Sequence, residues 1–223
     1  MTVVLAIDVG GSHVKAKTST GTERRRFDSG PDLTAAQMVA GVLEIAAGWE
    51  WDVVSIGIPA PIRGGKVLAE PVHLGNGWVG FDFEAAFGKP VKVVNDAVMQ
   101  AIGSYEGGRM LFLGLGTGLG TTLIADGVVL PMELGHLPFH HGTFEDNVGE
   151  AALEREGKKA WRKTVFDAVG RLHAALLPDE IVIGGGGVKE LDELPPGCRR
   201  GANENAFVGG FRLWEPEWVN RLG

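Results

Sequence analysis

A chain of 223 residues is long enough for one large domain or two small ones. Its 44% hydrophobic and 22% charged residues are typical of a soluble globular protein and exclude a disordered one. The net charge of −7 argues against a nucleic-acid partner, and no apolar run has the length of a membrane span. The single cysteine, Cys198, excludes a disulfide framework, and the N-terminus has no signal-peptide pattern, so we expect a cytoplasmic protein.

The first predicted unit is a strand, a turn and a second strand, at residues 3–7, 8–12 and 13–18. Asp8 leaves the first strand just before two glycines, where backbone N–H groups can approach an anion closely. A carboxylate beside an anion site makes chemical sense if a divalent cation bridges the two. The alternative for this segment alone is a hairpin closed by an Asx-turn.

The same pattern recurs at residues 110–123, where an apolar strand, a Gly/Thr turn and a second strand follow one another. Two such units predict a duplicated domain with two anion-binding turns. The copies differ in chemistry, because the first carries Asp8 and Lys15 whereas the second offers neutral amides and one hydroxyl. One half is therefore expected to hold metal and phosphate, and the other to bind phosphate oxygens.

The segment between the two copies alternates helix and strand. A helix is predicted to begin at Asp32 or Thr34 and to end at Gly48. A buried strand at residues 53–58 and a hairpin at residues 62–68 follow.

A short strand at residues 92–94 delivers Asn95 and Asp96 to its carboxyl end. In α/β sheets ligands bind outside the carboxyl ends of the strands, which makes Asp96 a candidate reactive carboxylate. A helix N-cap is the structural alternative for Asp96.

The glycine pair after residue 106 is predicted to separate a domain of residues 1–107 from one of residues 108–223. The last predicted helix, residues 205–213, is free in this scheme to pack back on the first domain. Helices are also predicted at residues 145–153 and 158–177, and a strand at 181–183 runs into a third glycine turn. The longer helix carries four cations, for which a solvated helix face is the ordinary explanation: Lys158, Lys159, Arg162 and Lys163.

In this order, the three glycine turns and the Asn-Asp pair resemble the sugar-kinase/actin-like superfamily and, within it, the ROK (repressor, ORF, kinase) family. Residues 8–12 match the first phosphate motif, 114–120 the second, 133–136 the Glu-x-Gly-His sugar motif and 184–186 the nucleotide-side glycines. The segment from residue 133 to 214 is similar to polyphosphate glucokinases. The resemblance implies an α/β, two-domain actin-like (ribonuclease-H-like) fold with a central cleft and a compact second domain.

The resemblance also implies roles for single residues. Asp96 is expected to be the general base that takes a proton from the sugar hydroxyl. Asn95, Glu133, His136 and Glu145 are expected to hydrogen-bond the sugar, because carboxylates and amides recognise paired hydroxyls. Asn76 lies in a glycine-rich loop that resembles the sugar loop, with a plain turn residue as its alternative. The implied phosphate-binding set is Asp8, Gly10, Gly11, Ser12, Lys15, Gly116, Thr117, Gly118, Gly185 and Gly186, with Mg²⁺ as the cofactor at Asp8, held through phosphate or water.

Two departures from the family pattern bear on the site. Many ROK proteins form a zinc site from the motif histidine and three downstream cysteines, which are absent here, so we expect no zinc. His140 and His141 could join His136 in a three-histidine site only as a minor alternative. The span between residues 136 and 184 is also short, with fewer helices than a full adenosine-binding subdomain uses.

We therefore expect phosphoryl transfer to the 6-hydroxyl of glucose, with inorganic polyphosphate as donor. Four unpaired cations on one helix would repel one another, which favours a polyanion partner along a track of Lys158, Lys159, Arg162 and Lys163. An ATP-dependent ROK kinase of glucose or another hexose is the first alternative, and a sugar-sensing regulator without catalysis is the second. No nucleic acid or membrane partner is expected. The sequence leaves the oligomeric state open, with a homodimer as one alternative.

Overall fold

The computed structural model describes residues 2–202 and 204–218. The chain forms two compact units, one from Met1–Gly103 together with Glu204–Leu222 and one from Ser104–Asn203. The division thus lies at Gly103 rather than at residue 107, and the described end of the chain belongs with its beginning.

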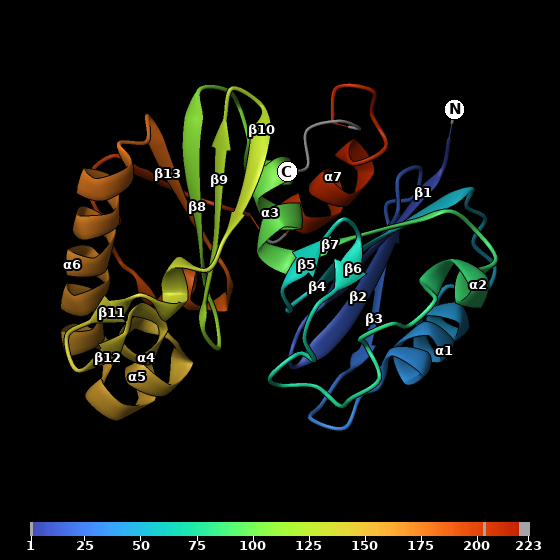
Figure 1. Cartoon of the computed structure of the whole chain (residues 1–223), viewed down its shortest axis with the longest axis horizontal. Helices are drawn as coiled ribbons and strands as arrows, with labels where there is room; N and C mark the ends of the chain where they lie inside the picture. The colour runs from blue at the N-terminus through green and yellow to red at the C-terminus, as the bar shows by residue number, and fades with distance from the viewer. Residues whose placement is uncertain (1, 203, 219–223) are drawn as a thin grey trace. The chain divides into compact units, whose positions relative to one another are not determined.

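The first unit is built on a five-stranded mixed sheet (Figure 1). β1 pairs antiparallel with β2 and parallel with β4, which in turn is parallel to β7. Every residue of β1 and β4 is buried, as expected of strands covered on both faces. The sheet order is β3-β2-β1-β4-β7, with β1 at Val4–Val9, β2 at His13–Thr18, β3 at Arg24–Asp28, β4 at Val53–Ile58 and β7 at Val91–Asn95.

Helices cover both faces of this sheet. Alternate residues of β1 such as Leu5 pack in the core that contains α1 (Ala35–Ile45). Thr34 is the N-cap of α1 and forms a capping box with Gln37, so it is Thr34 that fills the predicted role. The unit also contains α2 (Phe83–Phe87), α3 (Asp96–Ser104) and the predicted hairpin, formed by β5 (Ile62–Arg63) and β6 (Lys66–Val67).

The other face is covered by α7 (Asn205–Arg212), which comes from the end of the chain. The buried Ser55 hydroxyl of β4 donates to the Gly210 carbonyl at 2.6 Å and accepts from Trp214 Nε1 at 2.9 Å. α7 crosses α3 at very close range, because a Cβ at Gly209 would lie 1.7 Å from the Met99 carbonyl oxygen. Only glycine fits there, so this crossing fixes the end of the chain to the first unit.

The second unit repeats the strand arrangement of the first (Figure 1). On one side of β8, β9 pairs antiparallel with it and β10 pairs antiparallel with β9. On the other side, β13 is parallel to β8 and β14 is parallel to β13. This shared topology confirms the predicted duplication. The order is β10-β9-β8-β13-β14, with β8 at Arg109–Leu115, β9 at Leu119–Ala125, β10 at Val128–Met132, β13 at Glu180–Gly184 and β14 at Cys198–Arg200.

The single helix predicted at residues 145–153 is two helices, α4 (Phe144–Val148) and α5 (Glu150–Glu156). They break at Gly149, where a Cβ would lie 2.5 Å from the Thr117 carbonyl oxygen of the second glycine turn. The remaining elements are the 3-10 helices η1 (Leu134–His136) and η2 (Gly186–Glu190), the long helix α6 (Lys158–Leu176), and the short strands β11 (Pro138–Phe139) and β12 (Gly142–Thr143).

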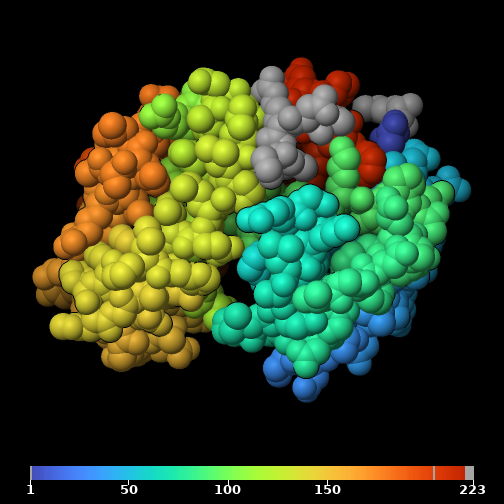
Figure 2. Space-filling view, in the orientation of Figure 1, coloured from blue at the N-terminus to red at the C-terminus, as the bar shows by residue number. Residues whose placement is uncertain are grey.

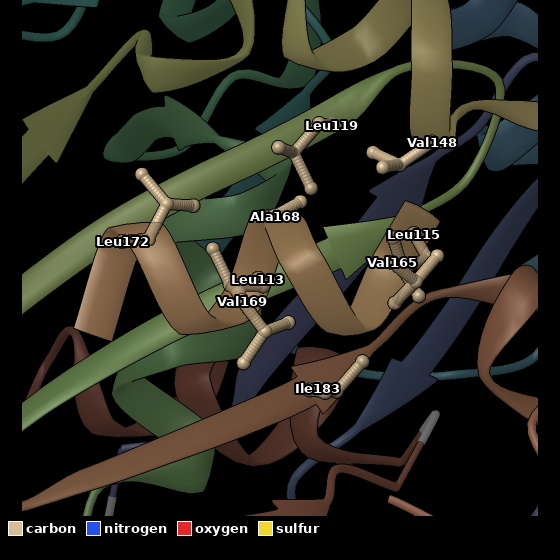
Figure 3. Close-up of a pocket in the computed structure, with 9 residues that line it drawn as sticks. All are labelled: Leu113, Leu115, Leu119, Val148, Val165, Ala168, Val169, Leu172 and Ile183. Carbon is tan, nitrogen blue, oxygen red and sulfur yellow. The ribbon is translucent and has the colours of Figure 1, made fainter. Parts of the chain in front are cut away.

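The core of the second unit lies between the sheet and α6. Figure 3 shows the side chains that surround a cavity of about 10 Å³ there. This volume is about that of one water-sized sphere and its lining is apolar, so the cavity belongs to the packing of the core. The lining residues are Leu113, Leu115, Leu119, Val148, Val165, Ala168, Val169, Leu172 and Ile183. Within residues 2–202 and 204–218, no helix has both the length and the apolar character needed to cross a membrane.

Candidate active site

In the first unit the predicted site residues lie at the carboxyl ends of neighbouring parallel strands. Asp8 of β1 lies opposite Gly57 of β4, and Ile58 of β4 lies opposite Asn95 of β7. Gly57 also leaves room for the start of α3, because a Cβ there would lie 3.2 Å from Asp96 Cα. The sheet therefore brings Asp8 and the Asn-Asp pair to one edge, which is where α/β folds bind ligands.

Asp8 forms an ion pair across the two strands that the first turn joins. Lys15 lies opposite Asp8 on β2, and its Nζ is 3.0 Å from Asp8 Oδ2. The Asp8 side chain is only 12% exposed, so the pair is screened less than a surface pair would be. The Gly10 N–H donates to the His13 carbonyl at 3.0 Å, which removes one of the predicted anion donors. The amides of Gly11 and Ser12 form no hydrogen bond with another described residue and remain for an anion.

Asn95 is the residue that caps α3. Its Oδ1 accepts from the Ala97 N–H at 2.9 Å, and its Nδ2 donates to the Ala60 carbonyl at 3.1 Å. One N–H and one lone pair of the Asn95 amide are left for a sugar hydroxyl. Asp96 is consequently the first residue of α3.

In the second unit Glu133, His136 and Glu145 gather around η1 and the first turn of α4. His136 Nε2 lies 3.6 Å from Glu145 Oε1. Partial burial of the Glu133 carboxylate raises its pKa; the nearby His136 opposes this rise, and the like charge of Glu145 adds to it. The residue as a whole is exposed, which limits the effect of burial in the free chain.

Thr121 holds the backbone around Glu133, a role that the sequence did not reveal. Its Oγ1 donates to the Met132 carbonyl at 2.7 Å and accepts from the Leu134 N–H at 3.1 Å. The residue is buried on β9, so it fixes Glu133 from both sides along the chain. A threonine in a strand carries no local signal for this role, since its partners are more than ten residues away.

The second glycine turn touches this acidic cluster. A Cβ at Gly118 would lie 2.5 Å from Glu145 Oε2, so the carboxylate occupies the space that a side chain would fill. The Gly116 N–H donates to the Gly118 carbonyl at 3.1 Å, and the Glu150 N–H donates to the Gly116 carbonyl at 3.0 Å. Thr117 is exposed at the tip. Candidate sugar-binding and phosphate-binding groups are therefore adjacent within one unit.

The third glycine turn lies beside the second. β13 and β8 are parallel, with Gly184 opposite Gly114. Gly185 has a φ of 80°, and a Cβ there would lie 2.2 Å from the Leu115 carbonyl oxygen. This approach needs glycine, and it leaves Gly186 exposed at the start of η2.

The four cations at the start of α6 are not all unpaired, so that premise of the polyphosphate track is wrong. Lys158 Nζ lies 2.5 Å from Glu190 Oε2. Arg162 binds both carboxylate oxygens of Asp192 and donates through Nε to the Glu190 carbonyl at 2.5 Å. These contacts join α6 to η2 and could not be read from helical spacing. Lys159 and Lys163 are exposed and form no ion pair with another described residue.

The histidines considered for a metal site lie against different carboxylates. His140 Nε2 is 3.1 Å from Asp167 Oδ2, whereas His136 faces Glu145. Over residues 2–202 and 204–218, no group of three or more His, Cys, Asp or Glu side chains is placed to hold a metal ion. Asn76 lies exposed in the loop after β6, and its side chain bonds to no other described residue.

The sequence matches no protein-family model. It is 24% identical over 212 residues to the polyphosphate glucokinase of Mycobacterium tuberculosis, covering 85% of this chain and 80% of that protein. The solved structure of the inorganic polyphosphate/ATP-glucomannokinase from Arthrobacter sp. strain KM matches with a TM-score of 0.83 at 24% identity, over 94% of this chain and 97% of that one. A ROK family glucokinase from Streptomyces griseus matches with a TM-score of 0.77 at 16% identity, over 95% and 98% of the two chains.

The chain thus has the α/β fold of the ROK sugar kinases, which confirms the predicted fold class. Over most of its length its sequence is similar to polyphosphate glucokinases, which confirms the resemblance seen in the motifs.

Proposed function

We propose that this protein is a kinase that transfers a phosphoryl group from inorganic polyphosphate to the 6-hydroxyl of glucose. The observation that carries the proposal is the contact between the acidic cluster and the second glycine turn, where Glu145 fills the space beside Gly118. A sugar held by Glu133, His136 and Glu145 would lie next to amides that can bind a phosphate. The similarity to polyphosphate glucokinases supports the same reaction.

The proposed chemistry places Asp96 as the general base. The Asp96 carboxylate takes the proton of the 6-hydroxyl as the sugar oxygen forms a bond to the terminal phosphorus. The bond from that phosphorus to the next bridging oxygen breaks, and the polyphosphate leaves shortened by one unit. Such a transfer needs mostly positioning and charge neutralisation, so one base and several amide donors suffice on the protein side.

A divalent metal fits beside Asp8. One carboxylate oxygen accepts a hydrogen bond from Lys15, while the other accepts none from a described residue, and Gly11 and Ser12 follow in the adjoining turn. Mg²⁺ usually takes one or two carboxylates and completes its shell with water and substrate phosphates. Asp8 would hold this ion directly or through water, and the ion would neutralise charge on the donor phosphates.

Lys159 and Lys163 are the cations that we propose for the donor chain. Both lie on the exposed side of α6, one turn apart, so they can follow an extended polyanion without breaking an internal ion pair. Lys158 and Arg162 keep a structural role in this proposal, because Glu190 and Asp192 already neutralise them.

ATP remains a second candidate donor because of one observation. A groove of about 460 Å³ lies beside Arg162, Lys163, Phe166, Asp192 and Glu193. Phe166 is 37% exposed, and an exposed aromatic ring can stack on a flat base. The second unit, although it has fewer helices than a full adenosine-binding subdomain, thus offers an aromatic side chain beside a groove.

A coupled assay for glucose 6-phosphate tests the proposal with long-chain polyphosphate, pyrophosphate and ATP as donors at equal phosphate concentration. We expect turnover with polyphosphate to exceed turnover with ATP by about tenfold or more in kcat/KM, which corresponds to about 1.4 kcal/mol. Faster turnover with ATP than with polyphosphate would identify ATP as the donor. Glucose binding without turnover on any donor would favour the sugar-sensing regulator.

A further inference from the structure

The loop that joins β6 to α2 exposes unusual side chains. Val72 is 88% exposed, and His73 and Asn76 are exposed beside it. Figure 2 shows the β5–β6 hairpin and the chain that follows it, in cyan to green, at the surface of the first unit. An exposed apolar side chain next to polar ones suits a hexose, which has an apolar ring face and a rim of hydroxyls.

One side of this loop is fixed by Leu33, the residue before the N-cap of α1. The Leu33 carbonyl accepts from the Gly75 N–H at 3.0 Å and from Trp78 Nε1 at 3.3 Å. The Trp78 side chain is fully buried. Gly75 lies so close that a Cβ would be 2.6 Å from the Asp32 carbonyl oxygen, so the backbone cannot shift inward there.

Glu70 fixes the other side. Its carboxylate accepts from the Trp78 N–H at 2.9 Å and from the Val79 N–H at 3.3 Å, which ties the start of the loop to its end. These backbone N–H groups, that of Trp78 above all, lower the pKa of Glu70. Glu70 forms no ion pair with another described residue, so the partners of its carboxylate are the backbone N–H groups of the loop.

The loop is also joined to the proposed catalytic edge. The Leu68 N–H donates to the Pro61 carbonyl at 2.9 Å, which closes the β5–β6 hairpin, and Asn95 Nδ2 holds the Ala60 carbonyl at the base of the hairpin. The β5–β6 hairpin, which immediately precedes Glu70 in the chain, is therefore held by Asn95, the residue before Asp96.

We propose that Glu70 is a positioning residue, which holds residues 71–77 in the conformation that binds the hexose. Val72 would cover the apolar face of the sugar, and His73 and Asn76 would reach its hydroxyls. A loop that is fixed before the ligand arrives loses less conformational entropy on binding. This proposal rests on the proposed function, because it names the loop that reads the sugar in that reaction.

Steady-state kinetics of Glu70→Ala and Glu70→Gln test this role, with Glu50→Gln as the matched control. Glu50 is exposed in the same unit and its side chain bonds to no other described residue. We expect Glu70→Ala to raise the KM for glucose roughly tenfold, with kcat and the KM for polyphosphate within about twofold of wild type. Glu70→Gln keeps one acceptor oxygen and should show a smaller rise, and Glu50→Gln should show none.

Glucose titration calorimetry and thermal melting separate positioning from a loss of folding. A tenfold weaker glucose affinity with a folded fraction equal to that of wild type would support the role. A normal KM for glucose in both Glu70 variants, or equal rises in KM for glucose and polyphosphate, would overturn it while leaving the kinase proposal intact. A wild-type protein that neither binds nor phosphorylates glucose would overturn both.

Discussion

The two glycine turns share a scaffold but differ in where their charges lie. Each follows the first strand of its sheet, and in each a glycine N–H is used within the turn, Gly10 to His13 and Gly116 to Gly118. The first turn is flanked by a carboxylate and an ammonium group, Asp8 and Lys15, on the paired strands that it joins. The second turn is neutral and receives a carboxylate from α4 instead.

This difference shows how a duplicated scaffold can divide one reaction. The strand topology, which sets where the turns lie, is the same in both copies. The segments that follow are different, because the first copy continues to the Asn-Asp pair where β7 meets α3 and the second to the cluster around η1 and α4. Function thus lies in what is added to the fold rather than in the repeated part.

The largest expected effect concerns the first copy. Asp96→Asn keeps the size and a polar group but removes the base, so kcat should fall by roughly 10²-fold or more with little change in glucose affinity. Steady-state kinetics and glucose calorimetry measure the two quantities, with Asp126→Asn in an exposed turn as control. A turnover near that of wild type would remove Asp96 from the reaction.

Changing each turn separately sharpens the contrast between them. Asp8→Asn should lower kcat by about tenfold or more and weaken the dependence of the rate on Mg²⁺, because it removes the carboxylate that we propose to hold the metal ion. Gly118→Ala places a methyl group against Glu145 and should raise the KM values for glucose and donor together, by roughly tenfold. Titrations of both variants with Mg²⁺ test this. A changed Mg²⁺ dependence in Gly118→Ala would contradict the assignment of the metal to the first turn alone.

Replacing the unpaired cations of α6 should change the KM for polyphosphate more than replacing a paired one. Replacing Lys159 and Lys163 with Ala should raise the KM for polyphosphate severalfold, and added salt should raise the KM of the wild type further. Lys158→Ala, compared with Lys159→Ala alone, is the matched control, because each removes one positive charge and Glu190 already neutralises that of Lys158. Equal effects of the two changes on the KM for polyphosphate, or equal losses with ATP, would place the donor elsewhere.

The smallest effect is expected on stability. The raised pKa of Glu133 means that folding favours its protonated form, so this contribution to stability is present at low pH and is lost as pH rises through the folded pKa. Glu133→Gln should therefore raise the melting temperature at neutral pH by about 1–2 °C, a small gain because the residue is exposed. Glucose affinity should fall in the same variant. A melting temperature of Glu133→Gln that lies below that of the wild type at pH 7 and equals it at pH 4 would show instead that folding lowers the pKa of Glu133.

Strands and turns could be predicted because their signals are local. Apolar runs that end in glycine mark β1, β8 and β13, and the structure has strands in each place. The break at Gly149 could not be predicted, since it depends on the Thr117 carbonyl, far away along the chain.

The partners of the charged side chains were what the sequence could not predict at the candidate site. The four cations of α6 could be located from the sequence, but their partners Glu190 and Asp192 lie beyond a strand and a turn. The same holds for Glu70, whose acceptors are used by amides eight and nine residues later. Such contacts depend on tertiary packing, which periodicity does not encode.

The return of α7 to the first unit has a consequence for synthesis on the ribosome. The first unit lacks one covering helix until residues 205–212 emerge, and until then the hydroxyl of Ser55 has no Gly210 carbonyl to bind. All of the second unit, Ser104–Asn203, has left the exit tunnel before residues 205–212 emerge. The order of completion is therefore the reverse of the order of translation, and a chaperone that binds the nascent chain would meet the uncovered face of the first sheet.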